Sequence, residues 1–252
     1  MEFDLALSSY IAIAAIVVFA YAVFGLTGFG SAMVGVPLLV QIVPLSVAVP
    51  LVVLMDIVST SLVGWRSRRN FDRIEFTRIV PAMLAGIAFG ATVLATFKPR
   101  WLLIGLGLFV LGNAAWTLLS KRAVQTPIHP FWAIPAGLVG GMFGAAFGAG
   151  GPVYTIYLAR RIEDPDRFRA TIVAVVFISG ALRLSAFLFA GLLDETELLL
   201  TALLMLPFSL LGSFIGSRLR RQFDAHTLKL LLFIFLLFGG AAVLTRALFM
   251  PS

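Results

Sequence analysis

The sequence predicts an all-α membrane protein that crosses the bilayer many times. Hydrophobic residues make up 60% of its 252 residues and charged residues only 12%. Long apolar stretches recur from end to end, as in a polytopic membrane protein, and they lack the alternation of apolar and polar residues that marks a transmembrane β-barrel. A Gly-rich pattern inside this apolar sequence occurs twice.

Ten apolar segments divide the chain into two repeats, residues 1–124 and 125–252. The segments of the first repeat are Leu5–Phe24, Ala32–Val43, Ser46–Trp65, Arg78–Phe97 and Trp101–Leu119. Those of the second are Pro130–Phe147, Pro152–Ala159, Arg169–Leu192, Leu198–Ser217 and Leu228–Leu248. Because a span needs about 20 apolar residues, the second segment of each repeat is too short to cross alone. We expect it to form a hairpin with the segment before it, with a Gly-rich turn inside the membrane, and the other three segments to cross fully.

The basic residues favour this arrangement. If the N-terminus lies outside and each hairpin returns to its own side, three basic residues fall outside, namely Lys98, Arg100 and Arg246. Fifteen fall inside, namely Arg66, Arg68, Arg69, Arg73, Arg78, Lys121, Arg122, Arg160, Arg161, Arg167, Arg169, Arg218, Arg220, Arg221 and Lys229. This agrees with the positive-inside rule, and it explains the net charge of +7 without nucleic acid.

The same count predicts that the two repeats are inverted. One returning hairpin and three crossings make an odd number of passes, so the second repeat starts on the opposite side from the first. The repeats would then be related by a pseudo-twofold axis in the membrane plane. The alternative, eight ordinary helices in two parallel halves, would put some of the arginine clusters outside.

The repeated pattern is GLTGFGSAMVGV at Gly25–Val36 and GAAFGAGGPVYTIY at Gly144–Tyr157. Its copies are offset by 148 − 28 = 120 residues. Glycine lets the backbone turn sharply, and the turn glycines are Gly28, Gly30, Gly148, Gly150 and Gly151. Helices should then begin near Ser31 and near Pro152, since proline suits a first helical turn.

A helix N-terminus carries partial positive charge and free N–H donors, so it binds anions. Two such ends in inverted repeats would meet near the membrane midplane, as in transporters with broken helices. The competing interpretation is that the glycines only allow helices to approach closely. Ser31 and Tyr154, beside the breaks, could add hydrogen bonds to a bound anion.

Arg183 lies well inside an apolar segment. A buried arginine costs about 2.5–3.5 kcal/mol on insertion scales, so it should face the bundle interior and have a partner. Ser179 precedes it by four residues and shares its helical face. Arg183 could contact an anionic substrate, or it could form a structural ion pair with Asp56.

Asp56 lies near the middle of the segment Ser46–Trp65, followed by Ser59, which the 120-residue offset pairs with Ser179. Both faces should therefore look toward one central cavity. Asp56 could carry a proton and so couple transport to protons, or it could only neutralise Arg183.

The two Gly-rich stretches resemble the sulfite exporter family of the TauE/SafE type. The resemblance is carried by GFGSAMVGVPLL and GGMFGAAFGAGGPVYTIYL and covers essentially the full length. The chain departs from the family pattern where Ser31 follows Gly30 in place of consecutive glycines, and where Tyr157 replaces the proline matched by Pro37. The resemblance implies export of a small anion such as sulfite, sulfoacetate or another organosulfur or carboxylate anion across a bacterial inner membrane.

The sequence thus predicts a transporter that is not an enzyme and uses no cofactor or metal. Its partners would be a small anion and the lipid bilayer, and its N-terminus would be periplasmic. The predicted substrate-binding residues are Gly28, Gly30, Ser31, Ser59, Gly148, Gly150, Gly151, Tyr154, Ser179 and Arg183, with Asp56 as the coupling residue. Uptake, channel behaviour and proton coupling are left open by the sequence, as is the oligomeric state, a homodimer included.

Overall fold

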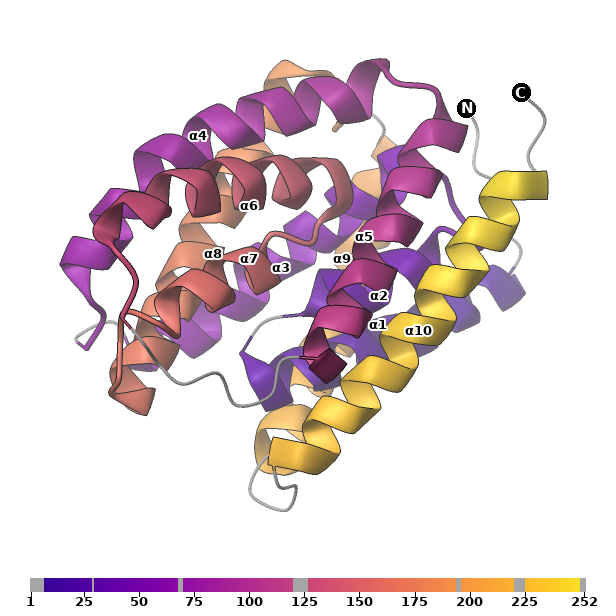
Figure 1. Cartoon of the computed structure of the whole chain (residues 1–252). Helices are drawn as coiled ribbons and strands as arrows, with labels where there is room; N and C mark the ends of the chain where they lie inside the picture. The colour runs from indigo at the N-terminus through magenta and orange to yellow at the C-terminus, as the bar shows by residue number, and fades with distance from the viewer. Residues whose placement is uncertain are drawn as a thin grey trace.

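A computed structural model describes residues 7–28, 30–67, 70–119, 127–193, 196–219 and 225–249 (Figure 1). The helices of the first half of the chain are α1 (Leu7–Thr27), α2 (Ser31–Leu39), α3 (Leu45–Ser67), α4 (Arg73–Thr96) and α5 (Pro99–Leu119). Those of the second half are the 3-10 turn η1 (Pro130–Trp132), α6 (Ala133–Phe147), α7 (Gly151–Leu158), α8 (Pro165–Phe189), α9 (Thr196–Leu219) and α10 (Ala225–Phe249).

The predicted fold class, an all-α polytopic membrane protein, is confirmed. All regular structure within the described ranges is helical. Five helices are long and apolar enough to cross a membrane, namely α1, α4, α8, α9 and the Pro130–Phe147 stretch that contains α6. The two short helices next to the Gly-rich stretches, α2 and α7, have 9 and 8 residues and cannot span a bilayer alone.

Two helices begin at least one full turn earlier than their apolar segments predicted. Helix α4 starts at Arg73 rather than Arg78, because the carboxylate of Asp72 accepts hydrogen bonds from two backbone N–H groups of the first turn, at 3.0 Å each. Helix α8 starts at Pro165 rather than Arg169, because Asp164 caps it in the same way. Aspartate is a favoured N-cap, so these first turns are helical even though their residues are largely polar.

The backbone breaks between α1 and α2 and between α6 and α7 use left-handed glycines. Gly28 and Gly30 have φ of 86° and 98°, and Gly148 has φ of 73°. Side chains rarely adopt this region, which explains why glycine stands there. The following helices begin at Ser31 and Gly151, within one residue of the predicted starts.

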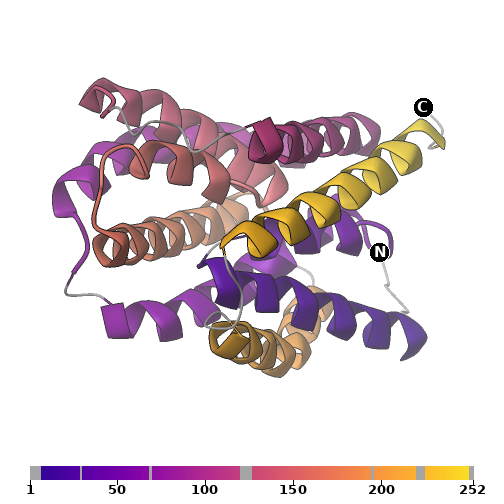
Figure 2. The ribbon, with the colours of Figure 1, turned by 60° about the horizontal axis from the view of Figure 1, so that its bottom comes forward.

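The closest helix pairs join the two halves of the chain. Helix α4 packs along α6, α1 packs along α9, and α5 packs along α10 (Figures 1 and 2). Glycines bring the first two pairs into backbone contact: a Cβ on Gly86 would lie 2.1 Å from the Leu138 carbonyl oxygen, and one on Gly216 would lie 2.0 Å from that of Ala22. This is the small-residue packing typical of membrane helices.

The helix ends sort to two sides of the molecule. The starts of α4, α6 and α8 lie toward one end, and the start of α1 and the end of α10 lie toward the other (Figures 1 and 2). Many large apolar side chains on the outer surface are exposed, such as Phe89, Leu108 and Phe238, as expected for helices that face lipid.

Six of the fifteen basic residues that we expect on the inside lie outside the described residues, namely Arg68, Arg69, Lys121, Arg122, Arg220 and Arg221.

Candidate functional site: a central pocket between the two breaks

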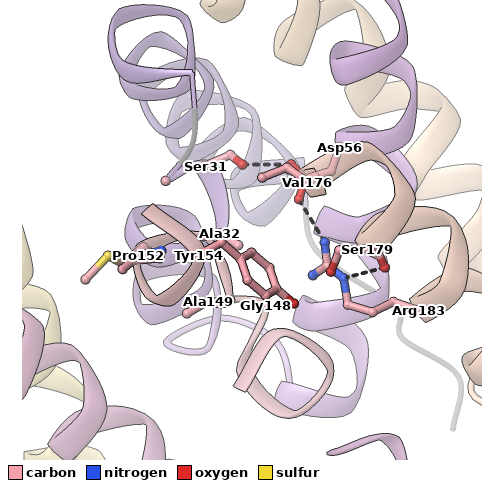
Figure 3. A pocket seen from close by; sticks show the side chains of 14 residues that line it. Ser31, Ala32, Asp56, Gly148, Ala149, Pro152, Tyr154, Val176, Ser179 and Arg183 are labelled. Carbon is pink, nitrogen blue, oxygen red and sulfur yellow. Dashed lines mark hydrogen bonds and ion pairs between the residues drawn. The ribbon is translucent and has the colours of Figure 1, made fainter. Parts of the chain in front are cut away.

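The two Gly-rich breaks line one central pocket together with α3 and α8 (Figure 3). Its lining residues are Gly30, Ser31, Ala32, Met33, Asp56, Gly148, Ala149, Gly150, Gly151, Pro152, Tyr154, Val176, Ser179 and Arg183. Apolar side chains and backbone therefore surround a small set of polar groups, which is the usual make-up of a small-ligand site.

The N-terminus of α2, whose first amides have no partner within the helix, lies at this pocket. The first bond of the helix runs from the Val34 N–H to the Gly30 carbonyl, at 3.1 Å. The amides of Ser31, Ala32 and Met33 precede it and so have no partner within the helix. All three residues line the pocket, where these donors and the helix dipole favour negative charge.

The N-terminus of α7 offers fewer donors than the sequence suggested. Pro152 carries no N–H, and the Val153 N–H already donates to the Gly150 carbonyl, at 3.1 Å. The main contribution of this break to the pocket is steric, because its glycines let the backbone come close to the start of α2. A Cβ on Gly148 would lie 2.9 Å from the Cβ of Ala32, so the second break touches the start of α2.

Asp56 lies at the middle of α3 and is 4% exposed. Its Oδ1 accepts hydrogen bonds from the hydroxyls of Ser31, at 2.7 Å, and Tyr21, at 2.8 Å. Since Ser31 begins α2, this contact sets the start of α2 level with the middle of α3.

Arg183, on α8, is 3% exposed and has two backbone carbonyls and Asp56 as partners, of which Figure 3 shows Ser179 and Asp56. Its Nε donates to the Ser179 carbonyl, at 3.3 Å, and its Nη1 donates to the Gly144 carbonyl, at 3.1 Å. Gly144 lies in the last turn of α6, where carbonyl groups carry partial negative charge. The third contact is an ion pair, with 3.7 Å between Nη2 and Oδ2 of Asp56.

Most of the predicted site residues come together in this pocket. Gly28 and Ser59 do not line it, although Ser59 is buried and lies one turn along α3 from Asp56. The Tyr154 hydroxyl is buried beside Ser179 without reaching hydrogen-bond geometry. It is therefore a polar group of the site without a partner among the described residues.

Sequence reasoning missed Tyr21 and the Gly144 carbonyl. Tyr21 is 1% exposed, and its single O–H, which donates to Asp56, also lies within hydrogen-bond distance of the Val52 carbonyl, at 3.1 Å. A tyrosine two turns before Gly28, inside an apolar segment, was the available signal, because a buried hydroxyl needs a partner. The carbonyl contact had no sequence signal, since it depends on how α6 and α8 pack.

A second polar cluster lies at the start of α4 and surrounds Glu75, which is 4% exposed. Arg161 donates to Glu75 Oε1 from Nε, at 3.0 Å, and from Nη2, at 2.8 Å. Arg78 donates to the same oxygen, at 2.7 Å, and the Tyr157 hydroxyl donates to Oε2. Hydrogen bonding to Glu75 raises the pKa of the Arg161 guanidinium. The cluster ties the end of α7 to the start of α4.

The fold and the pocket define a polytopic helical membrane protein with a central site that contains buried charged groups. Residues 13–243 match the family described as Sulfite exporter TauE/SafE. The chain belongs to this family, as its Gly-rich stretches predicted, and it is a membrane transporter.

One curated relative is the "Probable inner membrane transporter protein TsaS" of Comamonas testosteroni, which is 26% identical over 195 residues, 77% of this chain and 81% of the relative. No solved structure matches the chain.

Proposed function

We propose that this protein exports a small anion across a bacterial inner membrane by alternating access. The substrate would be sulfite, sulfoacetate or a related organosulfur or carboxylate anion, held in the central pocket. The observation that carries the proposal is that Arg183 and the first three residues of α2, whose amides have no partner within the helix, line one pocket. Family membership and the name of the relative support the inner-membrane location.

Two inverted repeats, residues 1–124 and 125–252, would provide the alternating motion. The helix contacts support this, because α4 packs on α6 just as α9, its counterpart in the second repeat, packs on α1. A salt bridge between Arg167 and Asp72, at 3.0 Å, also joins the starts of α8 and α4. The alternative of parallel halves would put these two starts on opposite sides of the membrane.

Export fits the membrane potential. An inside-negative potential contributes about 2.3 kcal/mol per elementary charge for each 100 mV, so it drives anions out of a cell without a coupled ion. The second candidate is an uptake permease or channel, with proton coupling through Asp56. The buried carboxylate of Asp56 favours it, because ionisable residues inside membrane helices often serve proton relays.

The test is transport in proteoliposomes that contain sulfite or sulfoacetate, with a potassium diffusion potential set by valinomycin. We expect saturable efflux that speeds up when the anion-containing lumen is negative, and loss of flux in R183Q. The control R160Q, which changes an arginine outside the pocket, should retain flux. If neither anion moves or raises the Tm of the purified protein, the proposed function is wrong. Ohmic conductance would identify a channel, and flux that responds only to a pH gradient would identify proton coupling.

A further inference from the structure

The two charged groups of the central pocket face each other without forming a hydrogen bond. The Arg183 Nη2 and the Asp56 Oδ2 are 3.7 Å apart, a distance within ion-pair range but beyond that of a normal N–H···O bond. Both side chains are at least 95% buried. The two side chains therefore attract each other by charge without a direct hydrogen bond. Separate hydrogen bonds hold each of them in place.

Arg183 has only one part of its guanidinium available to the pocket. Its Nε is bound to the Ser179 carbonyl, and one N–H of its Nη1 is bound to the Gly144 carbonyl. Within the described part of the chain, no hydrogen bond uses Nη2 or the second N–H of Nη1. An anion that binds Arg183 can use both groups, and at Nη2 it shares the nitrogen that Asp56 faces.

Asp56 has hydrogen-bond partners that do not depend on its contact with Arg183. Two hydroxyls, from Tyr21 and Ser31, hold its Oδ1, while its Oδ2 faces Arg183. When Arg183 turns to another anion, the carboxylate keeps two hydrogen bonds, so it is not left as a bare buried charge. When that anion leaves, Asp56 is in place to neutralise the arginine.

We propose that Asp56 is a tethered competitor of the transported anion for Arg183. In the empty carrier it occupies the arginine, and its return to Arg183 releases the bound anion, so it sets both affinity and turnover. This inference rests on the proposed function and extends it, because it assigns Asp56 the regulation of binding in the central pocket. The apparent affinity for the anion equals the intrinsic affinity multiplied by the fraction of time that Arg183 is free of Asp56.

Two variants with opposite expected signs test this proposal, with sulfite and sulfoacetate as probes. D56N removes the competitor, so the Kd of purified protein should fall about tenfold, with slower turnover in proteoliposomes because release becomes slower. Y21F removes one hydroxyl that holds the carboxylate, so Asp56 should compete more strongly and the Kd should rise several-fold. Tyr21 does not line the pocket, so it has no contact with the anion to lose. The matched control is Y10F, on the same helix.

The outcomes separate this inference from the proposed function. If the wild-type protein binds neither probe, the proposed function itself fails. If the wild type binds but D56N binds more weakly or equally, Asp56 only positions Arg183 and the competitor role is wrong. If D56N does not fold, Y21F decides, and unchanged or tighter binding in Y21F overturns the proposal.

Discussion

Gly148 of the second break lies against Ala32 of the first: a Cβ at position 148 would come within 2.9 Å of the Ala32 Cβ. The two breaks are 120 residues apart in sequence, and this contact is where they meet. The central pocket depends on it, because both residues line the pocket. Any side chain at position 148 would have to push the start of α2 away from α7.

Substituting Gly148 should therefore destabilise the protein more than substituting Gly28. Both glycines have positive φ, so alanine at either site costs about 1–2 kcal/mol. G148A also meets Ala32 and Val36, at 2.9 and 3.3 Å, whereas the nearest atom to a Cβ on Gly28 is 3.9 Å away. Overpacking adds about 1–3 kcal/mol. Thermal unfolding in detergent should show a larger loss of Tm for G148A than for G28A.

The double variant A32G/G148A supplies the control, because it removes the methyl group that meets the new one. We expect it to be more stable than the sum of the two single variants predicts. Strict additivity would show that the two breaks do not touch at this point.

The backbone contact between α4 and α6 makes a second prediction. G86A places a methyl group 2.1 Å from the Leu138 carbonyl oxygen, and the two helices must separate to admit it. We expect a loss of several kcal/mol, on the order of the costs of overpacking, or failure to assemble. G112A is the matched control, because nothing lies within 4 Å of its Cβ. It should be neutral or stabilising by up to about 1 kcal/mol through helix propensity, and equal Tm values for the two variants would contradict the helix contact.

The cluster around Glu75 should contribute to stability. E75Q leaves Arg161 without its buried anion, and breaking a buried pair costs about 3–5 kcal/mol. Because the Arg161 side chain is 21% exposed, we expect a value near the lower end. The control is E163Q, since Glu163 is exposed. A Tm for E75Q equal to that of E163Q would show that the cluster is only a surface feature.

The helices and the breaks were predictable from the sequence because they depend on local signals. Apolar runs gave the spans, and glycines followed by Ser31 or Pro152 gave the starts of α2 and α7. The early starts of α4 and α8 could also have been predicted, because Asp72 and Asp164 are favourable N-caps. The prediction missed them because it used only the extent of the apolar segments. Ser59 is the opposite case, because the repeat offset placed it at the pocket although the structure leaves it outside the lining.

The partners of the charged residues were less predictable because they depend on packing between distant helices. The ion pair between Asp56 and Arg183 was one of two alternatives that the sequence left open, and the structure places the two residues together. The sequence signals that Tyr21 needs a partner but does not name Asp56 as that partner, and the Glu75 cluster had no comparable signal. Glu75 follows several basic residues, so it reads as part of a solvated loop, whereas the structure buries it.

Cysteine labelling tests the orientation and the inverted repeats. The natural chain has no cysteine, so single cysteines can replace the exposed residues Gln41, Asn70, Lys98 and Glu163. With an outside N-terminus and two returning hairpins, an impermeant maleimide added to intact cells should label positions 41 and 98. Positions 70 and 163 should react only after the membrane is opened. The eight-helix alternative puts 70 and 163 on opposite sides, so labelling of one but not the other in intact cells would disprove the inverted arrangement, whereas exchange of the two pairs would reverse only the orientation.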